Sequence, residues 1–451
     1  MNLLHKRPDF FDSLPSIKIN KDDLSIIEDT LSYKKKVLEL IKNARKRIYI
    51  TTLYLQDDEA GQEILTAIYN AKQSNPDLDI KIFVDFLRAQ RGLMGFAKSE
   101  GNVRLYREMA AKYEHAVQIY GVPVKSKEFL GVLHLKGFVF DDTLLYSGSS
   151  INNIYLQQCD RYRYDRYHLI KCEELSNSFV KFLTENFVKN DAVKSLSTKE
   201  VVNIKSLKNA IRRMKLTLRK ADYSIKNADI GNNVNDIRVT PLLGFGARQN
   251  KLNKTIVELL RQTEKHAIIF TPYFNFPPKV NQSVRRLLKK GKKVTIIVGD
   301  KTASDFYISE ELPFNKAGIL PYIYETSLRR FIKANQKFID AELLDVCLWL
   351  DPGNSFHLKG ISSDQRNYLI TGHNINPRAW RLDIENGVLI RDKGQHLKTK
   401  FDSEFLQVMK HCTRISHFEE ISTPESYRPE AKKLLKSVKR AKLDSILNRL
   451  L

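Results

Sequence analysis

The pattern His-x-Lys-x-x-x-x-Asp occurs twice in the sequence, and its residue types suit chemistry at phosphorus. The two copies consist of His134, Lys136 and Asp141, and of His357, Lys359 and Asp364. A neutral imidazole is a nucleophile, while a lysine ammonium stabilises the oxygens of a phosphodiester. The imidazole of the other copy can serve as general acid for the leaving group and as general base for the incoming acceptor. We therefore predict one active site built from both copies, without a metal or a cofactor.

Each copy is followed by the pattern Gly-x-x-x-Asn, which places Gly148 before Asn152 and Gly372 before Asn376. An asparagine amide donates hydrogen bonds to phosphoryl oxygens, so we predict that Asn152 and Asn376 bind the substrate phosphate. Asparagine after a glycine is also common in turns, and a purely structural role is the alternative.

The motif aspartates differ from the histidines and lysines in their expected direction. Side chains two residues apart in a strand lie on one face, so His134 projects together with Lys136. Asp141 and Asp364 fall on the opposite face if the strands continue. We count both with the catalytic motif, but expect them to support the fold more than they touch the reacting atom.

A catalytic imidazole needs a partner on its second ring nitrogen, normally a carboxylate or a carbonyl. Asp165 follows His134 by 31 residues and Glu385 follows His357 by 28 residues, and both precede strand-like runs that align with each other. We predict that these carboxylates orient the histidines. A surface salt bridge is the alternative for each.

The elements that must position the motifs also occur twice. The run RIYITTLYLQ at 47–56 resembles HAIIFTPYFN at 266–275, and a helical stretch follows each. A second run then follows at 79–86 and at 292–300. These runs are rich in β-branched residues, which is typical of strands in a buried sheet. The repeat predicts an α/β fold of two tandem domains related by a pseudo-two-fold axis, with helices flanking mixed sheets.

The repeat also divides the chain into four segments. The predicted halves are residues 1–200 and 239–424. Residues 201–238 are polar and basic with apolar residues at helical spacing, so we expect a connecting helix there. Residues 425–451 are predicted to form a basic amphipathic C-terminal helix.

The charge balance predicts an anionic partner. Among 451 residues, 75 Lys and Arg stand against 52 Asp and Glu, a net charge of +23. Such a charge favours nucleic acid or a lipid headgroup surface without deciding between them. No apolar run reaches the roughly 18 residues that cross a bilayer, and we expect neither an integral nor an exported protein. The four widely spaced cysteines are those expected of reduced thiols in a cytosol.

The doubled motif with its Gly-x-x-x-Asn extension resembles the signature of the phospholipase D superfamily. Stretches such as YGVPVKSKEFLGVLHLKGF at 120–138 and YRYDRYHLI at 162–170 resemble the proteobacterial phosphatidylserine synthases of that superfamily, and the similarity covers nearly the whole chain. The resemblance implies transfer of a phosphatidyl group from CDP-diacylglycerol to L-serine, with release of CMP through a phosphatidyl-histidine intermediate. It further implies that His134 is the nucleophile and His357 the general acid and base.

Other activities stay open on the sequence. Cardiolipin synthases and lipid hydrolases of the superfamily share the motifs, although cardiolipin synthases usually carry apolar N-terminal segments. A basic phosphodiesterase or nuclease acting on nucleic acid also fits the charge and the paired motifs. A non-catalytic lipid-binding protein would tolerate the loss of a motif residue, whereas both copies are intact.

The C-terminal segment predicts reversible membrane attachment. After Pro429, apolar residues such as Leu434, Leu435 and Val438 recur at helical intervals between lysines and arginines. A helix of this kind lies in the interface of an anionic membrane. We expect a cytoplasmic protein that associates reversibly with the inner face of the cell membrane. A helix packed on its own domain is one alternative, and RNA or ribosome association through the same charge is another.

Overall fold

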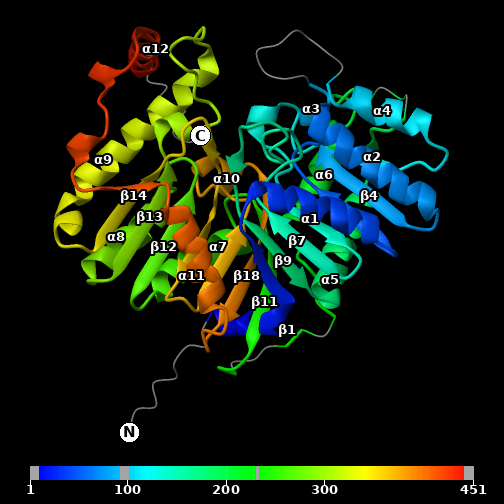
Figure 1. Ribbon diagram of the computed structural model, residues 1–451, viewed down its shortest axis with the longest axis horizontal. Coiled ribbons are helices and arrows are strands. Elements are labelled where there is room, and N and C mark those ends of the chain that lie inside the picture. Colours follow the sequence, from blue (N-terminus) through cyan, green and yellow to red (C-terminus); the bar gives the residue numbers. More distant parts are fainter. Residues whose placement is uncertain are drawn as a thin grey trace.

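The chain folds around two large mixed sheets, one in each half of the sequence. The computed structural model describes residues 10–91, 101–198, 200, 202–226, 228–229 and 233–440. The first half, blue to teal, lies on the right of Figure 1, and the second half, green to orange, lies on the left. Helices cover the outer side of each half.

The first-half sheet has eight strands in the order β10-β5-β4-β3-β6-β7-β9-β2. Their bounds are β2 (Leu24–Ile27), β3 (Arg47–Thr51), β4 (Asp79–Asp85), β5 (Gln118–Val122), β6 (Gly137–Phe140), β7 (Thr143–Ser147), β9 (Tyr167–Lys171) and β10 (Lys194–Ser195).

The second-half sheet has nine strands in the order β1-β11-β18-β17-β16-β12-β13-β14-β19. Their bounds are β1 (Ile17–Ile19), β11 (Ile237–Phe245), β12 (His266–Thr271), β13 (Lys293–Gly299), β14 (Leu344–Trp349), β16 (Gly360–Ser363), β17 (Asn367–Thr371), β18 (Ile384–Asp392) and β19 (Cys412–Ile415).

Eight strands of one sheet correspond in order and direction to eight of the other. In each sheet three parallel strands, β3-β4-β5 or β12-β13-β14, are followed by antiparallel strands, β6-β7-β9 or β16-β17-β18. The pseudo-two-fold of the predicted α/β fold is therefore confirmed. Among the strands that the described residues form in the two sheets, β1 alone has no counterpart: it belongs to the predicted first half but pairs with β11 of the other sheet.

The helices connect and cover these strands. Their bounds are α1 (Thr30–Asn43), α2 (Glu59–Ser74), α3 (Phe86–Ala89), α4 (Val103–Lys112), α5 (Glu173–Leu183), α6 (Lys208–Leu218), α7 (Lys251–Gln262), α8 (Pro278–Lys289), α9 (Leu320–Asp340), α10 (Pro377–Arg381), α11 (Lys398–Met409) and α12 (Pro429–Arg440). None of the helices within the described ranges combines the length and the apolar character that crossing a membrane requires.

Short side chains fix where several helices begin. Asp29 accepts a hydrogen bond from the amide of Ser32 at the start of α1, and Asp58 accepts one from Gly61 at the start of α2. Each of these caps satisfies an amide that has no partner inside its helix. The predicted connecting helix is α6, whose buried residues Ile211, Met214 and Leu218 recur at helical spacing.

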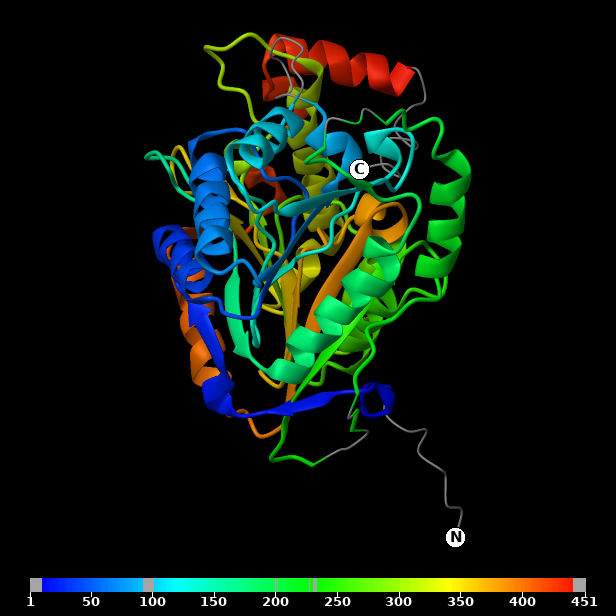
Figure 2. The same cartoon turned by 90° about the vertical axis from the view of Figure 1, so that its right-hand side faces the viewer.

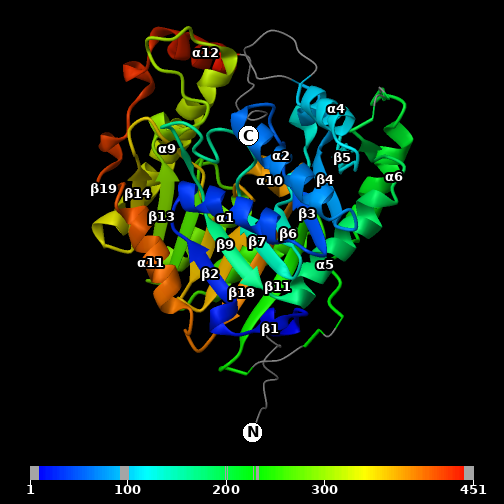
Figure 3. The ribbon, with the colours of Figure 1, turned by 45° about the vertical axis from the view of Figure 1, so that its right-hand side comes forward.

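The two halves share an apolar core, so they form one packed unit. Tyr49 and Leu144 of the first sheet lie in the same cluster as Ile370 and Val388 of the second. Helices α5 and α6 close this cluster on the side that faces the viewer in Figure 2. On another side, α11 lies beside β2, where the Lys400 ammonium donates a hydrogen bond of 2.6 Å to the carbonyl of Leu24 (Figure 3).

Candidate active site

Each motif histidine is held by a carboxylate from the opposite half of the chain. Nδ1 of His134 lies 2.9 Å from both carboxylate oxygens of Glu385. Nδ1 of His357 lies 2.8 Å from Oδ2 of Asp165. A carboxylate on Nδ1 leaves Nε2 of the imidazole for the substrate. The structure thus brings all four side chains together, but pairs each histidine across the halves and not with the carboxylate that follows it in sequence.

Backbone hydrogen bonds also join each motif histidine to the opposite half of the chain. The amide of His134 donates to the carbonyl of Ile384, and the amide of His357 donates to the carbonyl of Tyr164. The second contact extends a parallel pairing of β15 (Ser355–Phe356) with β8 (Arg163–Tyr164). The expectation that the histidines sit within the motif strands was wrong, because each lies in an extended connection just before β6 or β16.

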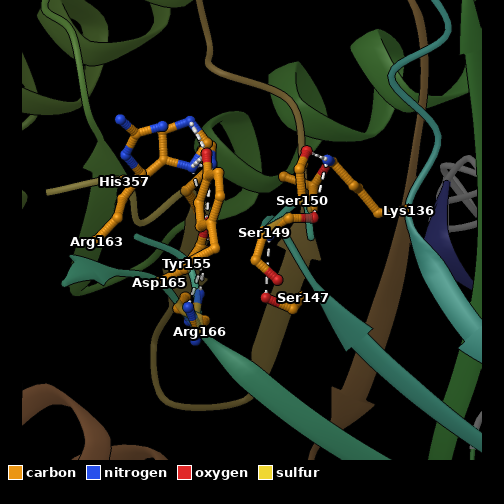
Figure 4. Close-up of polar contacts among 12 residues, drawn as sticks. Lys136, Ser147, Ser149, Ser150, Tyr155, Arg163, Asp165, Arg166 and His357 are labelled. Carbon is orange, nitrogen blue, oxygen red and sulfur yellow. Dashed lines mark hydrogen bonds and ion pairs between the residues drawn. The ribbon is translucent and has the colours of Figure 1, made fainter. Parts of the chain in front are cut away.

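The motif lysines are both buried but have different partners. Nζ of Lys136 donates to the carbonyl of Ser149 at 3.0 Å and to Oγ of Ser150 at 3.2 Å. Nζ of Lys359 instead lies 3.1 Å from Oδ2 of Asp165 and 3.1 Å from Nε2 of His357. Figure 4 shows this difference: Lys136 lies among serines, whereas Asp165 and His357 form a separate cluster.

The two motif glycines make room for the lysine of the opposite half. A Cβ atom added to Gly372 would lie 2.8 Å from Cγ of Lys136. One added to Gly148 would lie 2.8 Å from Nζ of Lys359 and from both carboxylate oxygens of Asp165. Separations below 3 Å force one of the groups to move, so only glycine permits this approach.

The motif asparagines have a structural contact in common. Oδ1 of Asn152 accepts from the amide of Tyr155 at 2.9 Å, and Oδ1 of Asn376 accepts from the amide of Ala379 at 2.9 Å. Both side chains therefore cap a helical turn. The cap uses only the amide oxygen, so phosphate binding through Nδ2 stays a prediction.

The motif aspartates lie at the opposite end of their strands from the histidines. Asp141 accepts from the backbone amides of Arg45, Lys46 and Arg47, where β3 begins. Asp364 makes the same three contacts with the amides of residues 264–266, where β12 begins. These contacts are those expected of carboxylates that support the fold, and a part of Asp141 and Asp364 in catalysis stays a prediction.

Comparison with known proteins identifies the family. A family model described as "Cardiolipin synthase, PLD-like domain" matches residues 37–178 and 256–409, once in each half. A CDP-diacylglycerol–serine O-phosphatidyltransferase from Haemophilus influenzae is 44% identical over 443 residues, which cover 97% of each chain. The chain belongs to the CDP-diacylglycerol–serine O-phosphatidyltransferase family of the phospholipase D superfamily.

Two further matches agree. The family member from Escherichia coli is 42% identical over 440 residues, which cover 97% of this chain and 96% of that one. The crystal structure of phosphatidylserine synthase from Haemophilus influenzae matches with a TM-score of 0.94 at 43% identity and covers 98% of each chain. The resemblance inferred from the sequence motifs is confirmed.

Burial and neighbouring charges set the protonation of the site in this family member. Burial, together with the charge of Lys359, lowers the pKa of His357 to about 3. Burial and the same ammonium lower the pKa of Lys136 to about 7, and burial lowers the pKa of Lys359 to about 8. Both imidazoles are therefore neutral at rest, because burial also lowers the pKa of His134.

The pKa values of the two carboxyls that contact the histidines are shifted in opposite directions. Burial raises the pKa of Asp165, but Lys359 and the hydrogen bond with His357 outweigh it and lower that pKa to about 2. The pKa of Glu385 is raised by burial and by the nearby Asp383. The pseudo-two-fold thus relates the positions of the two carboxyls, while burial and neighbouring charges shift their pKa values in opposite directions.

Several side chains at the site belong to none of the sequence motifs, so the sequence analysis did not predict them. The hydroxyl of Tyr155 lies 3.0 Å from Nδ1 of His357, and the guanidinium of Arg163 lies over the Tyr155 ring (Figure 4). Asn386 bonds both backbone groups of Lys136 at 2.8 Å. One signal in the sequence could have indicated Arg163, because it stands two residues before Asp165 and so shares a strand face with it.

Proposed function

We propose that this protein is a phosphatidylserine synthase, which transfers a phosphatidyl group from CDP-diacylglycerol to L-serine and releases CMP. The observation that carries the proposal is the meeting of two His-Lys pairs in one buried site, each imidazole held by a carboxylate of the other half. The names and near full-length similarity of the two bacterial relatives support the choice of donor and acceptor.

The reaction follows from the roles that the two imidazoles can take. Nε2 of His134 attacks phosphorus, and the bond from phosphorus to the CMP oxygen breaks while His357 protonates that oxygen. The serine hydroxyl oxygen then attacks phosphorus, the bond from phosphorus to Nε2 of His134 breaks, and the hydroxyl proton passes to His357. The two ammonium groups offset the negative charge of the phosphoryl oxygens.

The pKa of His357 adds a condition to this scheme. At a pKa of about 3 the resting imidazole is neutral and cannot act as an acid at neutral pH. An anionic substrate beside the ring favours the imidazolium and raises the pKa. Binding of the donor therefore favours the imidazolium form of His357, which is the form that can protonate the departing CMP.

The test is incubation of purified protein with CDP-diacylglycerol and labelled serine. We expect a labelled serine lipid and CMP in equal amounts. Transfer to glycerol-containing lipids would indicate a cardiolipin synthase, and release of phosphatidic acid alone would indicate a hydrolase. Cleavage of nucleic acid without lipid transfer would contradict the proposal.

The intermediate is tested with histidine variants. Without serine, donor labelled in its acyl chains should leave label on the protein, and His134→Ala should abolish it. His357→Ala should abolish turnover as well, since both imidazoles act in one reaction. Substantial turnover in either variant, with the fold verified by a thermal melt, would contradict a single shared site.

The protein is further proposed to attach reversibly to an anionic membrane. In the described part of α12, however, the apolar side does not face outward: Ala431 and Leu435 pack against Ile319, Tyr322 and Ile323. The expectation that Leu435 enters the lipid interface was wrong. Residues 441–451, which include the rest of the predicted amphipathic pattern, lie outside the described residues. The support that remains is charge, because Lys433 and Lys436 are exposed on α12.

A further inference from the structure

A pair of opposite charges lies beside His357 and has no part in the chemistry given so far. Arg163 belongs to β8, and Asp305 follows the short helix η5 (Lys301–Ala303). Nη1 of Arg163 lies 3.5 Å from Oδ2 of Asp305. The side chains are only 9% and 18% exposed, and that of His357 is 8% exposed. The three groups are thus nearly buried, yet each still reaches solvent.

Each member of this pair is linked to His357 through a tyrosine. The guanidinium of Arg163 lies 4.7 Å from the ring centroid of Tyr155, whose hydroxyl contacts the imidazole. Asp305 accepts a hydrogen bond from the hydroxyl of Tyr273, whose ring centroid is 6.4 Å from that of His357. The two charges are therefore held at fixed places around the proposed general base.

The pair is not satisfied by its own contact. A strong pair of guanidinium and carboxylate has two parallel hydrogen bonds of about 2.7–2.9 Å, whereas this one has a single contact at the outer limit. Nε of Arg163 is already used, because it donates to Oγ of Ser355 at 3.2 Å. Oδ1 of Asp305 is used as well, because it accepts from the hydroxyl of Tyr273. The neighbours thus fix both side chains, while their mutual contact of 3.5 Å stays long enough for a charged ligand to compete with it.

The chemistry of that ligand follows from the two signs. A guanidinium fork binds a carboxylate, and the carboxylate of Asp305 binds an ammonium. A zwitterion whose ammonium and carboxylate are attached to the same carbon atom can bind both partners at once. A diphosphate would be repelled by Asp305.

We infer that Arg163 and Asp305 hold the α-carboxylate and the α-ammonium of the acceptor serine and so aim its hydroxyl at His357. The inference rests on the proposed function and deepens it by naming the acceptor site. In the second step the serine oxygen bonds to phosphorus, the bond from phosphorus to His134 breaks, and the hydroxyl proton passes to His357. Arg163 and Asp305 make and break no bond, so they are specificity residues.

The experiment compares four acceptors in the full-length protein with CDP-diacylglycerol as donor. Serine carries both charges, 3-hydroxypropanoate lacks the ammonium, ethanolamine lacks the carboxylate, and water reports hydrolysis of the donor. Asp305→Asn should raise KM for serine about tenfold or more, which is the loss expected for one hydrogen bond to a charged group. It should leave 3-hydroxypropanoate and water unaffected.

Arg163→Lys gives the complementary result. The preference for serine over ethanolamine should fall about tenfold or more, because the fork that binds the carboxylate is gone. Asp402→Asn is the matched control, since this carboxylate pairs with Lys398 and Gln365 away from the site. It should leave KM unchanged for every acceptor.

Three outcomes would overturn the inference. The first is an unchanged serine KM in both variants. The second is an equal loss with all acceptors, water included, which would indicate a structural role. In both cases a wild-type protein that still makes the serine lipid leaves the proposed function intact. The third is a wild-type protein that transfers nothing to serine, which would overturn the proposed function as well.

Discussion

At the scale of single residues, two buried lysines, Lys136 and Lys359, belong to the proposed phosphate-binding site. Burial lowers the pKa of both ammonium groups, and the charge of Lys359 lowers that of Lys136 further, so neither is fully protonated at mildly alkaline pH. A bound phosphate diester favours the charged form of both. Affinity for the donor and protonation of the lysines are therefore coupled.

This coupling predicts the pH dependence of donor capture. The pKa values in the free protein are about 7 and about 8, and the protonated lysines bind phosphate, so kcat/KM for CDP-diacylglycerol should fall as pH rises through this range. The profile of kcat should fall only at higher pH, because bound substrate raises both pKa values. Steady-state rates between pH 6 and 10 check this, and a kcat/KM that rises across pH 7–9 would contradict it.

The same lysines predict that the stability of the folded protein rises with pH over the range in which kcat/KM falls. Their folded pKa values are below the unfolded value, so the unfolded chain binds more protons between about pH 7 and 10, and their contribution to the free energy of unfolding rises with pH in this window. Lys136→Met should remove part of that rise and should abolish turnover. Thermal melts of both proteins at several pH values measure it, and identical pH dependence would show that Lys136 makes no such contribution.

Substitution of a motif aspartate is predicted to lower the stability of the protein and to leave kcat nearly unchanged. Asp141→Ala removes the acceptor of three backbone amides at the start of β3 and should cost about 1–3 kcal/mol of stability. The value of kcat for the folded protein should stay near that of the wild type. Asp142→Ala, which removes the contacts of a 40% exposed carboxylate with Lys46 and Arg47, is the control. A large loss of kcat without a change in melting temperature would place Asp141 among the catalytic residues.

At the scale of elements, the site depends on a close approach between the two halves. A glycine of one half lies against a lysine of the other. Gly372→Ala should push Lys136 from its position, and a shift of about 1 Å near the chemistry costs on the order of 100-fold in rate. The melting temperature should change less than the rate does.

The control for this glycine is Gly353→Ala. Gly353 has a φ of +80° and an added Cβ would meet nothing within 4 Å. Its substitution should therefore cost stability through backbone strain and leave the rate unchanged. Equal effects of the two substitutions on kcat would contradict the role assigned to Gly372.

The strands and helices could be predicted because the sequence pattern of each one occurs twice in the chain. The runs at 47–56 and 266–275 became β3 and β12, and the second runs became β4 and β13. The exchange of Asp165 and Glu385 between the halves was not predictable, since spacing along the chain does not reveal which imidazole a carboxylate meets. Arg163 and Asp305 were not singled out either, because they come from segments far apart in sequence and only the fold joins them.

At the scale of the whole molecule, the net charge of +23 predicts attraction to anionic bilayers. Binding to liposomes in a flotation assay should increase with anionic lipid content and weaken with salt. Truncation after Tyr427 should reduce it, because the lysines of α12 and the following segment are lost. Equal binding by both chains would assign the attraction to other basic surfaces.

Truncation also uncovers the apolar residues of α9 that α12 covers, so a second variant is needed. Changing Lys432, Lys433 and Lys436 to glutamine keeps Ala431 and Leu435 in place and removes three charges. Each charge near an anionic surface is worth about 1 kcal/mol. Liposome binding that survives this change would assign the attraction to other basic surfaces. Loss of wild-type liposome binding in the presence of RNA, but not in the variant, would favour the nucleic-acid alternative for these lysines.

The contact of His134 with Glu385 joins residues 251 positions apart in the chain. During translation, His134 is made early, and its partner follows only after most of the second half has been synthesised. A nascent or prematurely terminated chain therefore carries an imidazole that nothing orients, however well its first sheet has folded. We therefore expect activity only from a chain long enough to include Glu385, so that partial products do not consume the proposed activated lipid.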